Sequence, residues 1–171
     1  MNMIFTKILT TPIGEMIAMA TENGLCALEH CQEIRQDLWK KRRKTYFPNC
    51  KDLNSSNRYI DDTEQWIGAF FDKKWQMMPT VKLDMRGSAF EILVWTSLLE
   101  IPLGVTQSYK SLASKIGSPS GARAVGNACR RNPISLIIPC HRVIGAAAQL
   151  TGYAGGLGAK ESLLNHEKNS G

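Results

Sequence analysis

The segment IIPCHRVIG, residues 137–145, places a cysteine directly beside a histidine within an apolar run. A thiol with its ordinary pKa of about 8.5 is mostly protonated at neutral pH, and burial raises that pKa further. A nucleophilic Cys140 therefore needs a base, which His141 can supply. Neighbouring side chains of an extended segment point apart, so we expect a bridging water to carry the proton between them. The apolar neighbours would keep competing water away from such a nucleophile.

The histidine in turn needs an acid that fixes its tautomer and stabilises its charged form. Glu167 stands near the end of the last predicted helix, KESLLNHEKN, which can pack back on the cysteine. A cysteine–histidine dipeptide alone is more often structural than catalytic, so the surrounding sequence has to decide. The acids available in this half of the chain are Asp84, Glu91, Glu100, Glu161 and Glu167.

Composition and charge place limits on the kind of protein. The chain has 171 residues, of which 43% are hydrophobic, enough to support a packed core. Residues 1–79 carry 11 Lys/Arg against 10 Asp/Glu, whereas residues 80–171 carry 10 against 5. This basic second half favours a polyanionic partner such as nucleic acid. No apolar run approaches the roughly 20 residues of a membrane helix, and the start lacks signal-peptide features. We expect a cytoplasmic protein with no membrane partner.

Five cysteines argue against a disulfide framework, because the number is odd and no secretory signal is evident. A zinc site built from Cys26, His30, Cys31 and Cys50 is conceivable, but the spacing fits no familiar ligand pattern. We therefore expect no metal, and we interpret Cys26 as a small buried residue on a strand.

The first half reads as an α/β domain, residues 1–79. Three short apolar runs within residues 1–30, separated by the turns TPIG and ENG, predict a small antiparallel sheet. A charged helix is predicted over 32–44, and its KKRRK run is better explained as a solvated helix end than as a nucleic-acid contact. A polar loop over 48–58 precedes a helix over 59–72, and residues 73–87 resemble a linker.

The second half, residues 80–171, reads as mainly helical. Ser88 with Glu91 three residues later predicts a capped helix start, and this helix runs to about Glu100. Further helices are predicted over 109–116 and 121–131, joined by a turn that contains glycine. Two helices joined in this way have the shape of a helix-turn-helix, although the pair alone does not indicate DNA binding.

Several segments of this half, in register, resemble the O6-alkylguanine-DNA alkyltransferases, also called methylated-DNA–protein-cysteine methyltransferases. The resemblance implies a ribonuclease H-like first domain and a winged-helix-like helix-turn-helix in the second. It covers about half of the chain strongly, and before residue 80 it rests on the TPIG turn and the general layout. The matching segments are VWTSLLEIPLG (94–104), SYKSLA (108–113), ARAVG (122–126), NPI (132–134), IIPCHRVIG (137–145), LTGYAGGL (150–157) and KESLLNHE (160–167).

The resemblance implies that Cys140 accepts an alkyl group from O6-alkylguanine, with activity on O4-alkylthymine left open. His141 would take the thiol proton through water, and Glu167 would hold His141. The thioether product has no easy leaving path, so the protein would be consumed in one turnover, without metal or organic cofactor. The implied partner is double-stranded DNA containing alkylated guanine, bound by a monomer.

The remaining implied roles concern the target base, which must leave the stack to reach a buried thiol. Arg123 would fill the space in the stack, beside the small Ala122, although a simple phosphate contact would also explain it. Tyr109 would donate a proton to the departing guanine, and otherwise it is a core aromatic. Asn132 would tie the recognition helix to the active segment, or else it simply ends a helix. The guanine pocket would be shaped by Val143, Tyr153 and Ala154.

Two departures from the family pattern stand out. Residues 146–149 read AAAQ where relatives commonly have a polar turn with glycine, and Ala154 replaces a serine that some relatives carry. Two other functions are consistent with parts of the sequence. A non-catalytic module that binds alkyl lesions would replace the cysteine, which is present here. A Cys–His hydrolase would need an oxyanion hole, for which the sequence has no clear signal.

Overall fold

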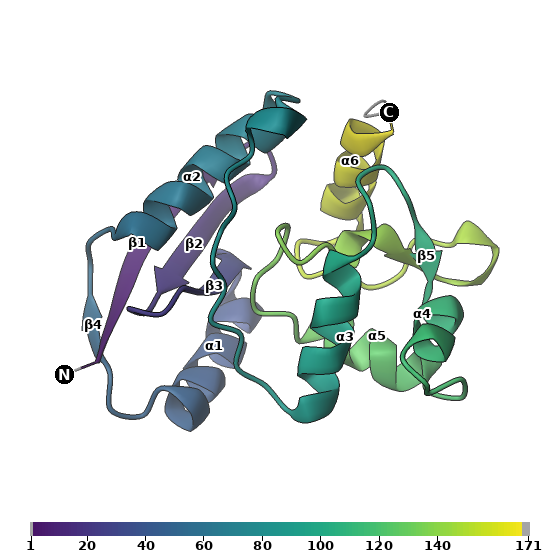
Figure 1. Ribbon diagram of the computed structural model, residues 1–171, viewed down its shortest axis with the longest axis horizontal. Coiled ribbons are helices and arrows are strands. Elements are labelled where there is room, and N and C mark those ends of the chain that lie inside the picture. The colour runs from purple at the N-terminus through teal and green to yellow at the C-terminus, as the bar shows by residue number, and fades with distance from the viewer. Residues whose placement is uncertain (1, 169–171) are drawn as a thin grey trace. The chain divides into compact units, whose positions relative to one another are not determined.

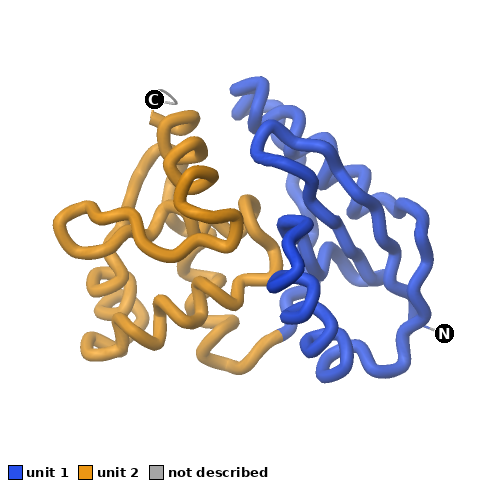
Figure 2. Tube along the Cα trace, turned by 180° about the vertical axis from the view of Figure 1, so that it is seen from behind, with its two compact units in different colours: residues 1–86 blue, residues 87–171 orange. Residues whose placement is uncertain are grey.

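The computed structural model describes residues 2–168, and the chain forms two compact units, Met1–Arg86 and Gly87–Gly171 (Figure 2). The domain boundary predicted after residue 79 differs from this division because residues 82–84 pair with a strand of the first unit. The backbone N–H of Leu25 donates to the Lys82 carbonyl (2.8 Å), and that of Asp84 donates to the Leu25 carbonyl (2.8 Å). Residues 82–84, within the segment 73–87 that resembles a linker, thus pair with the start of β3 in the first unit.

The first unit is built on a four-stranded sheet with the order β3-β2-β1-β4 (Figure 1). The strands β1 (Met3–Thr11), β2 (Gly14–Ala20) and β3 (Leu25–His30) form the predicted antiparallel meander. A small antiparallel sheet was predicted, whereas the sheet as a whole is mixed, because a fourth strand, β4 (Lys51–Leu53), pairs in parallel with β1. This strand was assigned to a polar loop because it is three residues long and fully exposed.

Two helices pack on this sheet. The helix α1 (Glu33–Tyr46) follows β3, and Trp39 with Phe47, just after it, packs against Ile4 and Met19 of the sheet. The helix α2 (Arg58–Phe71) contacts β1, β2 and β3. Its start is fixed by Asn57, whose side-chain oxygen accepts hydrogen bonds from two backbone N–H groups of the first turn. A short 3₁₀ turn, η1 (Trp75–Met77), follows.

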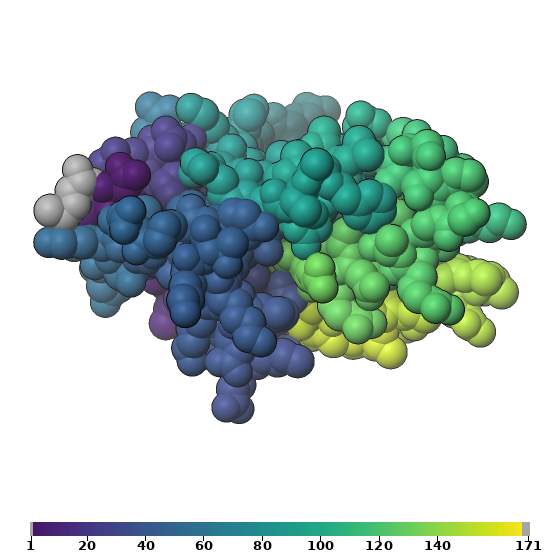
Figure 3. All heavy atoms as spheres, turned by 90° about the horizontal axis from the view of Figure 1, so that it is seen from below, coloured from purple at the N-terminus to yellow at the C-terminus, as the bar shows by residue number. Residues whose placement is uncertain are grey.

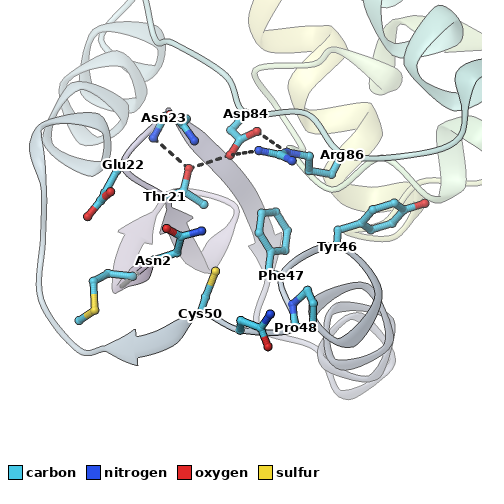
Figure 4. A pocket seen from close by; sticks show the side chains of 12 residues that line it. Asn2, Thr21, Glu22, Asn23, Tyr46, Phe47, Pro48, Cys50, Asp84 and Arg86 are labelled. Carbon is cyan, nitrogen blue, oxygen red and sulfur yellow. Dashed lines mark hydrogen bonds and ion pairs between the residues drawn. The ribbon is translucent and has the colours of Figure 1, made fainter.

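A polar cluster closes the edge where residues 82–86 meet the sheet (Figure 4). Thr21 Oγ1 donates to Asp84 Oδ2 (2.7 Å), and Arg86 Nε donates to Asp84 Oδ1 (2.6 Å). Gly24 lies in the adjoining turn with φ +157°, and a Cβ there would stand 2.7 Å from the Lys82 carbonyl oxygen. Only glycine therefore allows this close approach.

The second unit is mainly helical, as predicted. The helix α3 (Ala89–Leu99) begins with the predicted capping box, in which Ser88 and Glu91 bond reciprocally. The helices α4 (Tyr109–Lys115) and α5 (Ala122–Arg130) pack against each other across the turn 116–121. The indole N–H of Trp95, which is fully buried, donates to the Ala128 carbonyl (2.9 Å) and joins α3 to α5.

The remaining elements of this unit are short and lie after α5. The turn η2 (Cys140–Arg142) leads into β6 (Val143–Ile144), which pairs in parallel with β5 (Gln107–Ser108). The turn η3 (Ala146–Ala148) and a loop precede α6 (Leu157–Glu167), which starts before the predicted segment. Chain segments far apart in sequence thus meet around η2.

Three further features of the described residues 2–168 bear on the predictions. No helix among them is long and apolar enough to cross a membrane. None of the five cysteines, all of which lie in this range, forms a disulfide bond. Within the same range, no three His, Cys, Asp or Glu side chains gather in a way that would hold a metal ion.

Candidate active site

Cys140 is the first residue of η2, and its side chain is buried (4% exposed). Asn132, just beyond α5, donates from Nδ2 to Cys140 Sγ (3.3 Å) and to the Ile138 carbonyl (2.9 Å). Its Oδ1 accepts from the Ile134 N–H (3.0 Å). One buried amide therefore fixes the segment before the cysteine and places a donor on the sulfur. A donor there favours the anionic form of the thiol.

Glu167, at the end of α6, lies beside His141, and both side chains are fully buried. His141 Nε2 lies 2.8 Å from Glu167 Oε1. Burial alone would raise the pKa of Glu167, but the hydrogen bonds from His141 and Arg142 outweigh it and lower that pKa to about 2. An ionised carboxylate only accepts hydrogen bonds, so Nε2 carries the proton of the neutral ring and Nδ1 carries the lone pair.

Nδ1 of His141 is the available base of this site. It is buried, and no atom of the described residues hydrogen-bonds to it. Burial lowers the pKa of His141 below its ordinary value despite the opposing effect of Glu167, so the ring is neutral at pH 7. The structure thus supplies a neutral, oriented imidazole next to the cysteine in sequence, with the nitrogen that can accept a proton left without a protein partner.

Arg142 was not predicted as a site residue, yet it binds Glu167 more extensively than His141 does. Its Nε donates to Oε2 (2.9 Å), its Nη2 to Oε1 (3.0 Å), and its Nη1 to the Ile101 carbonyl (2.7 Å). Gly104 adds a backbone N–H to Oε2 (3.2 Å). Gly104 has φ +75°, and a Cβ there would meet the Glu167 carbonyl oxygen at 2.9 Å. Both conditions require glycine at this position.

Lys160 of α6 is a second residue that the sequence reasoning missed. Its side chain is fully buried, and Nζ donates to the carbonyls of Val143 (2.6 Å) and Thr151 (2.8 Å). Burial lowers the pKa of Lys160. A buried lysine that joins β6 to the following loop holds that loop in place. The sequence has no clear signal for this role, because Lys160 is followed by the polar Glu161 and Ser162 in the segment GAKESLL.

Tyr109 contacts the same loop. Its hydroxyl donates to the Thr151 carbonyl (3.3 Å), and Lys160 Nζ lies 5.9 Å from the centre of its ring. Burial raises the pKa of Tyr109, so the hydroxyl keeps its proton at neutral pH. The hydroxyl therefore carries a proton, which it donates to the Thr151 carbonyl in this structure.

Arg123 and Ala122 lie apart from the buried cluster, in the first turn of α5. They line a groove of about 330 Å³ together with Tyr109, and Cys140 is not among the residues that form it. Arg123 is exposed. The predicted residues therefore fall into two groups, a buried set around Cys140 and a surface set on α5, with Tyr109 belonging to the groove. The other residues that line the groove are Gly126, Asn127, Arg130, Thr151 and Gly152.

The predicted pocket residues lie in β6 and in the loop before α6. Val143 is buried in β6, next to η2. The ring of Tyr153 meets that of His141 edge to face, with centres 6.2 Å apart. Ala154 is half-buried in the same loop. In the unusual AAAQ turn, Ala147 and Ala148 both adopt left-handed backbone angles, φ 54° and 58°. Glycine adopts such angles more readily than alanine does, so the departure from the family pattern carries strain.

The second unit thus contains a buried cysteine next in sequence to a histidine that a glutamate holds in place. This arrangement is typical of proteins in which a cysteine thiol reacts as a nucleophile. Comparison with known proteins gives the family. Residues 89–169 match the family described as "6-O-methylguanine DNA methyltransferase, DNA binding domain". The chain is 38% identical to the methylated-DNA–protein-cysteine methyltransferase of Methanosarcina barkeri, over 98% of this chain and 99% of that protein. It belongs to the methylated-DNA–protein-cysteine methyltransferase family.

Two further comparisons agree with this. The corresponding enzyme of Mycobacterium tuberculosis strain H37Rv is 56% identical over 88 residues, which are 52% of this chain and 53% of that protein. A crystal structure of Mycobacterium tuberculosis OGT in complex with DNA superposes with a TM-score of 0.78 at 34% identity, covering 97% of this chain and 94% of that one. The fold is therefore that of the family, with a mixed sheet in the first unit and helices in the second.

Proposed function

We propose that this protein repairs DNA by moving the alkyl group from O6 of a guanine to Sγ of Cys140, once per protein molecule. The observation that carries the proposal is the buried pair of His141 and Glu167 next to a cysteine whose sulfur accepts a hydrogen bond from Asn132. Family membership supports DNA as the substrate, since a related structure holds DNA.

The proposed reaction is a direct displacement at the saturated carbon of the alkyl group. The thiol proton of Cys140 passes through a bridging water to Nδ1 of His141, whose positive charge Glu167 then stabilises. The thiolate attacks the carbon, the new S–C bond forms, and the C–O6 bond breaks with its electron pair passing to guanine. Tyr109 donates a proton to the departing base, which makes guanine a better leaving group. The thioether that remains on Cys140 ends the activity of that molecule.

The buried position of Cys140 supports base flipping as part of this function. A thiol that is 4% exposed is out of reach of a base stacked in a duplex, so the nucleotide has to rotate out of the helix. Arg123, exposed on α5 beside Ala122, is proposed to occupy the gap in the base stack. Val143, Tyr153 and Ala154 are proposed to surround the extruded guanine.

Intact-mass measurement after incubation with a duplex containing one O6-methylguanine tests this proposal. The expected result is a mass increase of one methylene, which peptide mapping places on Cys140. The change Cys140→Ser abolishes the increase, whereas Cys31→Ser, at a partly exposed cysteine of the first unit, leaves it unchanged. Tight binding of the methylated duplex without any mass change would instead identify a lesion-binding module and overturn the proposal. Repeated turnover of an activated ester would identify a hydrolase.

A further inference from the structure

The last turns of α1 carry five basic residues in succession, and the structure separates them into two kinds. Arg43 Nε pairs with Asp52 (3.2 Å), and its other nitrogens bind the carbonyls of Phe47 and Cys50. Arg42 donates to the Arg86 carbonyl (2.6 Å). Arg43 therefore holds the chain that follows α1, and Arg42 holds the end of the first unit at Arg86, so neither arginine needs an external partner.

Among the described residues, no hydrogen bond links the side chains of the other three, Lys40, Lys41 and Lys44, to another segment of the chain. All three are exposed. Positions 40, 41 and 44 are related by steps of three and four residues, so their side chains lie on one face of the helix. Lys40 contacts Asp37 (3.2 Å) in an exposed pair, which contributes little to stability. Among the described residues, no ion pair involves Lys41 or Lys44. We call these three residues the α1 lysine face.

Helix polarity explains only part of this arrangement. Positive charge near the carboxyl end of a helix is favourable, because it offsets the partial negative charge of the last carbonyls. The effect acts within the last turn, which here already contains Arg43 and Lys44. The residues of α1 (blue) lie at the surface of the molecule in Figure 3, and three lysines on one exposed face of the helix repel one another, a repulsion that a bound anion relieves.

The sequence alone favoured a solvated helix end for the KKRRK run, but the separate roles of its residues in the structure lead to another interpretation. We propose that the α1 lysine face is a second DNA-binding surface, which contacts the phosphates of duplex DNA independently of α5. Lysine ammonium groups bind phosphates as point charges, without reading bases. The family's partner, DNA, presents closely spaced phosphates along a regular backbone, and this matches a row of lysines on a helix. The surface would add affinity for any sequence and would hold the protein on undamaged DNA.

An anionic membrane is the main competing partner for a basic helix. Membrane-surface helices place a broad apolar face opposite their charges. The exposed apolar side chains of α1 are Ile34 and Leu38, one turn apart and before the lysines. Two side chains do not make such a face, so the observations favour DNA.

The test compares two triple variants with the same change in charge. One is Lys40→Glu/Lys41→Glu/Lys44→Glu, and the control is Lys73→Glu/Lys74→Glu/Lys82→Glu, at exposed lysines elsewhere in the first unit. Fluorescence anisotropy with an unmodified duplex gives the dissociation constant over a range of salt concentrations. Because about 0.9 counterion is released per neutralised phosphate, the slope of log affinity against log salt should fall by about 2 to 3 in the α1 variant, with binding weakened about tenfold or more at low salt.

The control variant is expected to keep binding within about threefold and its slope nearly unchanged. Equal losses of DNA affinity in both variants would show that only the net charge matters. Unchanged DNA affinity in the α1 variant would show that the lysines do not contact DNA. Either result overturns the proposal. So would a selective loss of binding to phosphatidylserine vesicles with DNA binding retained. Should the glutamate variant fail to fold, Lys40→Gln/Lys41→Gln/Lys44→Gln removes the same phosphate contacts and should show the same fall in slope. Methyl transfer from free O6-methylguanine is expected to be unchanged, which separates this surface from the chemistry at Cys140.

Discussion

Each of the two units buries a glutamate against an arginine, and the two pairs differ in what surrounds them. In the first unit, Arg35 contacts Glu29 through Nε (2.7 Å) and Nη2 (2.6 Å), and both contacts fall on one oxygen, Oε2. In the second, both oxygens of Glu167 accept hydrogen bonds. Oε1 accepts from His141 and Arg142, and Oε2 accepts from Arg142 and the Gly104 N–H. The residue types are the same, but the number and placement of the donors are not.

The pKa values respond in opposite directions. Burial raises the pKa of Glu29 to about 7, because the attraction of Arg35 only partly offsets the loss of hydration. The additional donors around Glu167 more than offset burial and lower its pKa to about 2. Donors on both oxygens therefore favour the ionised form of Glu167, whereas the contacts of Arg35 with one oxygen of Glu29 only partly offset the effect of burial. An ionised Glu167 can hold His141 in a fixed tautomer at neutral pH.

The largest expected effect comes from Glu167→Gln. The amide no longer holds Nε2 protonated or stabilises the imidazolium, so the rate of methyl transfer is expected to fall by about 10² to 10⁴. Single-turnover kinetics with a methylated duplex measures the rate, and circular dichroism checks the fold. Glu161→Gln, exposed on the same helix, and Glu29→Gln should leave the rate within about twofold. A loss in Glu29→Gln as large as that in Glu167→Gln would break the comparison between the two pairs.

Lys160→Met tests a third buried charged group. Its partners are two backbone carbonyls, whereas each of the buried arginines above has a glutamate carboxylate as its partner. Methionine fits the stem but leaves the carbonyls of Val143 and Thr151 without their donor, which costs about 1–3 kcal/mol each. We expect the free energy of unfolding in urea to fall by about 2–6 kcal/mol, and methyl transfer to slow because the pocket loop is released. Lys168→Met, at the exposed end of α6, is the control and should change little. Equal stability of the Lys160→Met variant and the wild type would show that the carbonyls find other donors.

The Glu29 pair predicts a distinctive pH dependence of stability. Because the folded state raises the pKa of Glu29 from its ordinary 4.5 to about 7, its contribution is fully present below pH 4.5 and is lost as the pH rises through 7. Relative to Glu29→Gln, the wild type should therefore lose up to about 3 kcal/mol of unfolding free energy over that interval. Urea unfolding of both proteins from pH 4.5 to pH 8 measures the difference.

Comparing two proteins also removes the effect of His30. Burial lowers its pKa to about 4, so its contribution is present above pH 6.5 and is lost as the pH falls through 4, in the wild type and the variant alike. A difference between the two proteins that stays constant over the interval would show that Arg35 keeps Glu29 ionised, and the contrast with Glu167 would disappear.

The sequence was sufficient for the parts of the molecule that local chemistry determines. The capping box of Ser88 and Glu91 and the meander of residues 3–30 follow from spacing and turn residues alone. The pairing of His141 with Glu167 was predicted from the need of a histidine for an acid, together with the family resemblance, and the structure places them 2.8 Å apart. These are cases where residue type and spacing restrict the choice to a few partners.

The parts that were missed depend on contacts that spacing does not encode. Arg142 contacts the Ile101 carbonyl, and Lys160 contacts the Val143 carbonyl, so both bind backbone groups that become available only in the folded chain. The strand β4 forms because an exposed tripeptide meets the free edge of β1. Opposite pKa shifts for Glu29 and Glu167 also could not be predicted, because they depend on how many donors reach each carboxylate.

The smallest expected effect concerns turns, where the two units also differ. The two turns of the first unit's meander have glycine at positive φ, Gly14 and Gly24, although Lys73 after α2 also adopts φ 58°; the pocket turn of the second unit has Ala147 and Ala148. A left-handed alanine costs roughly 1–2 kcal/mol, and glycine loses about 0.5–1 kcal/mol more backbone entropy on folding. Ala148→Gly should therefore raise the free energy of unfolding by about 0.5 kcal/mol, measured by urea titration. Ala146→Gly, in the same turn without a positive φ, should lower it by a similar amount, and equal signs for the two variants would show that the turn is not strained.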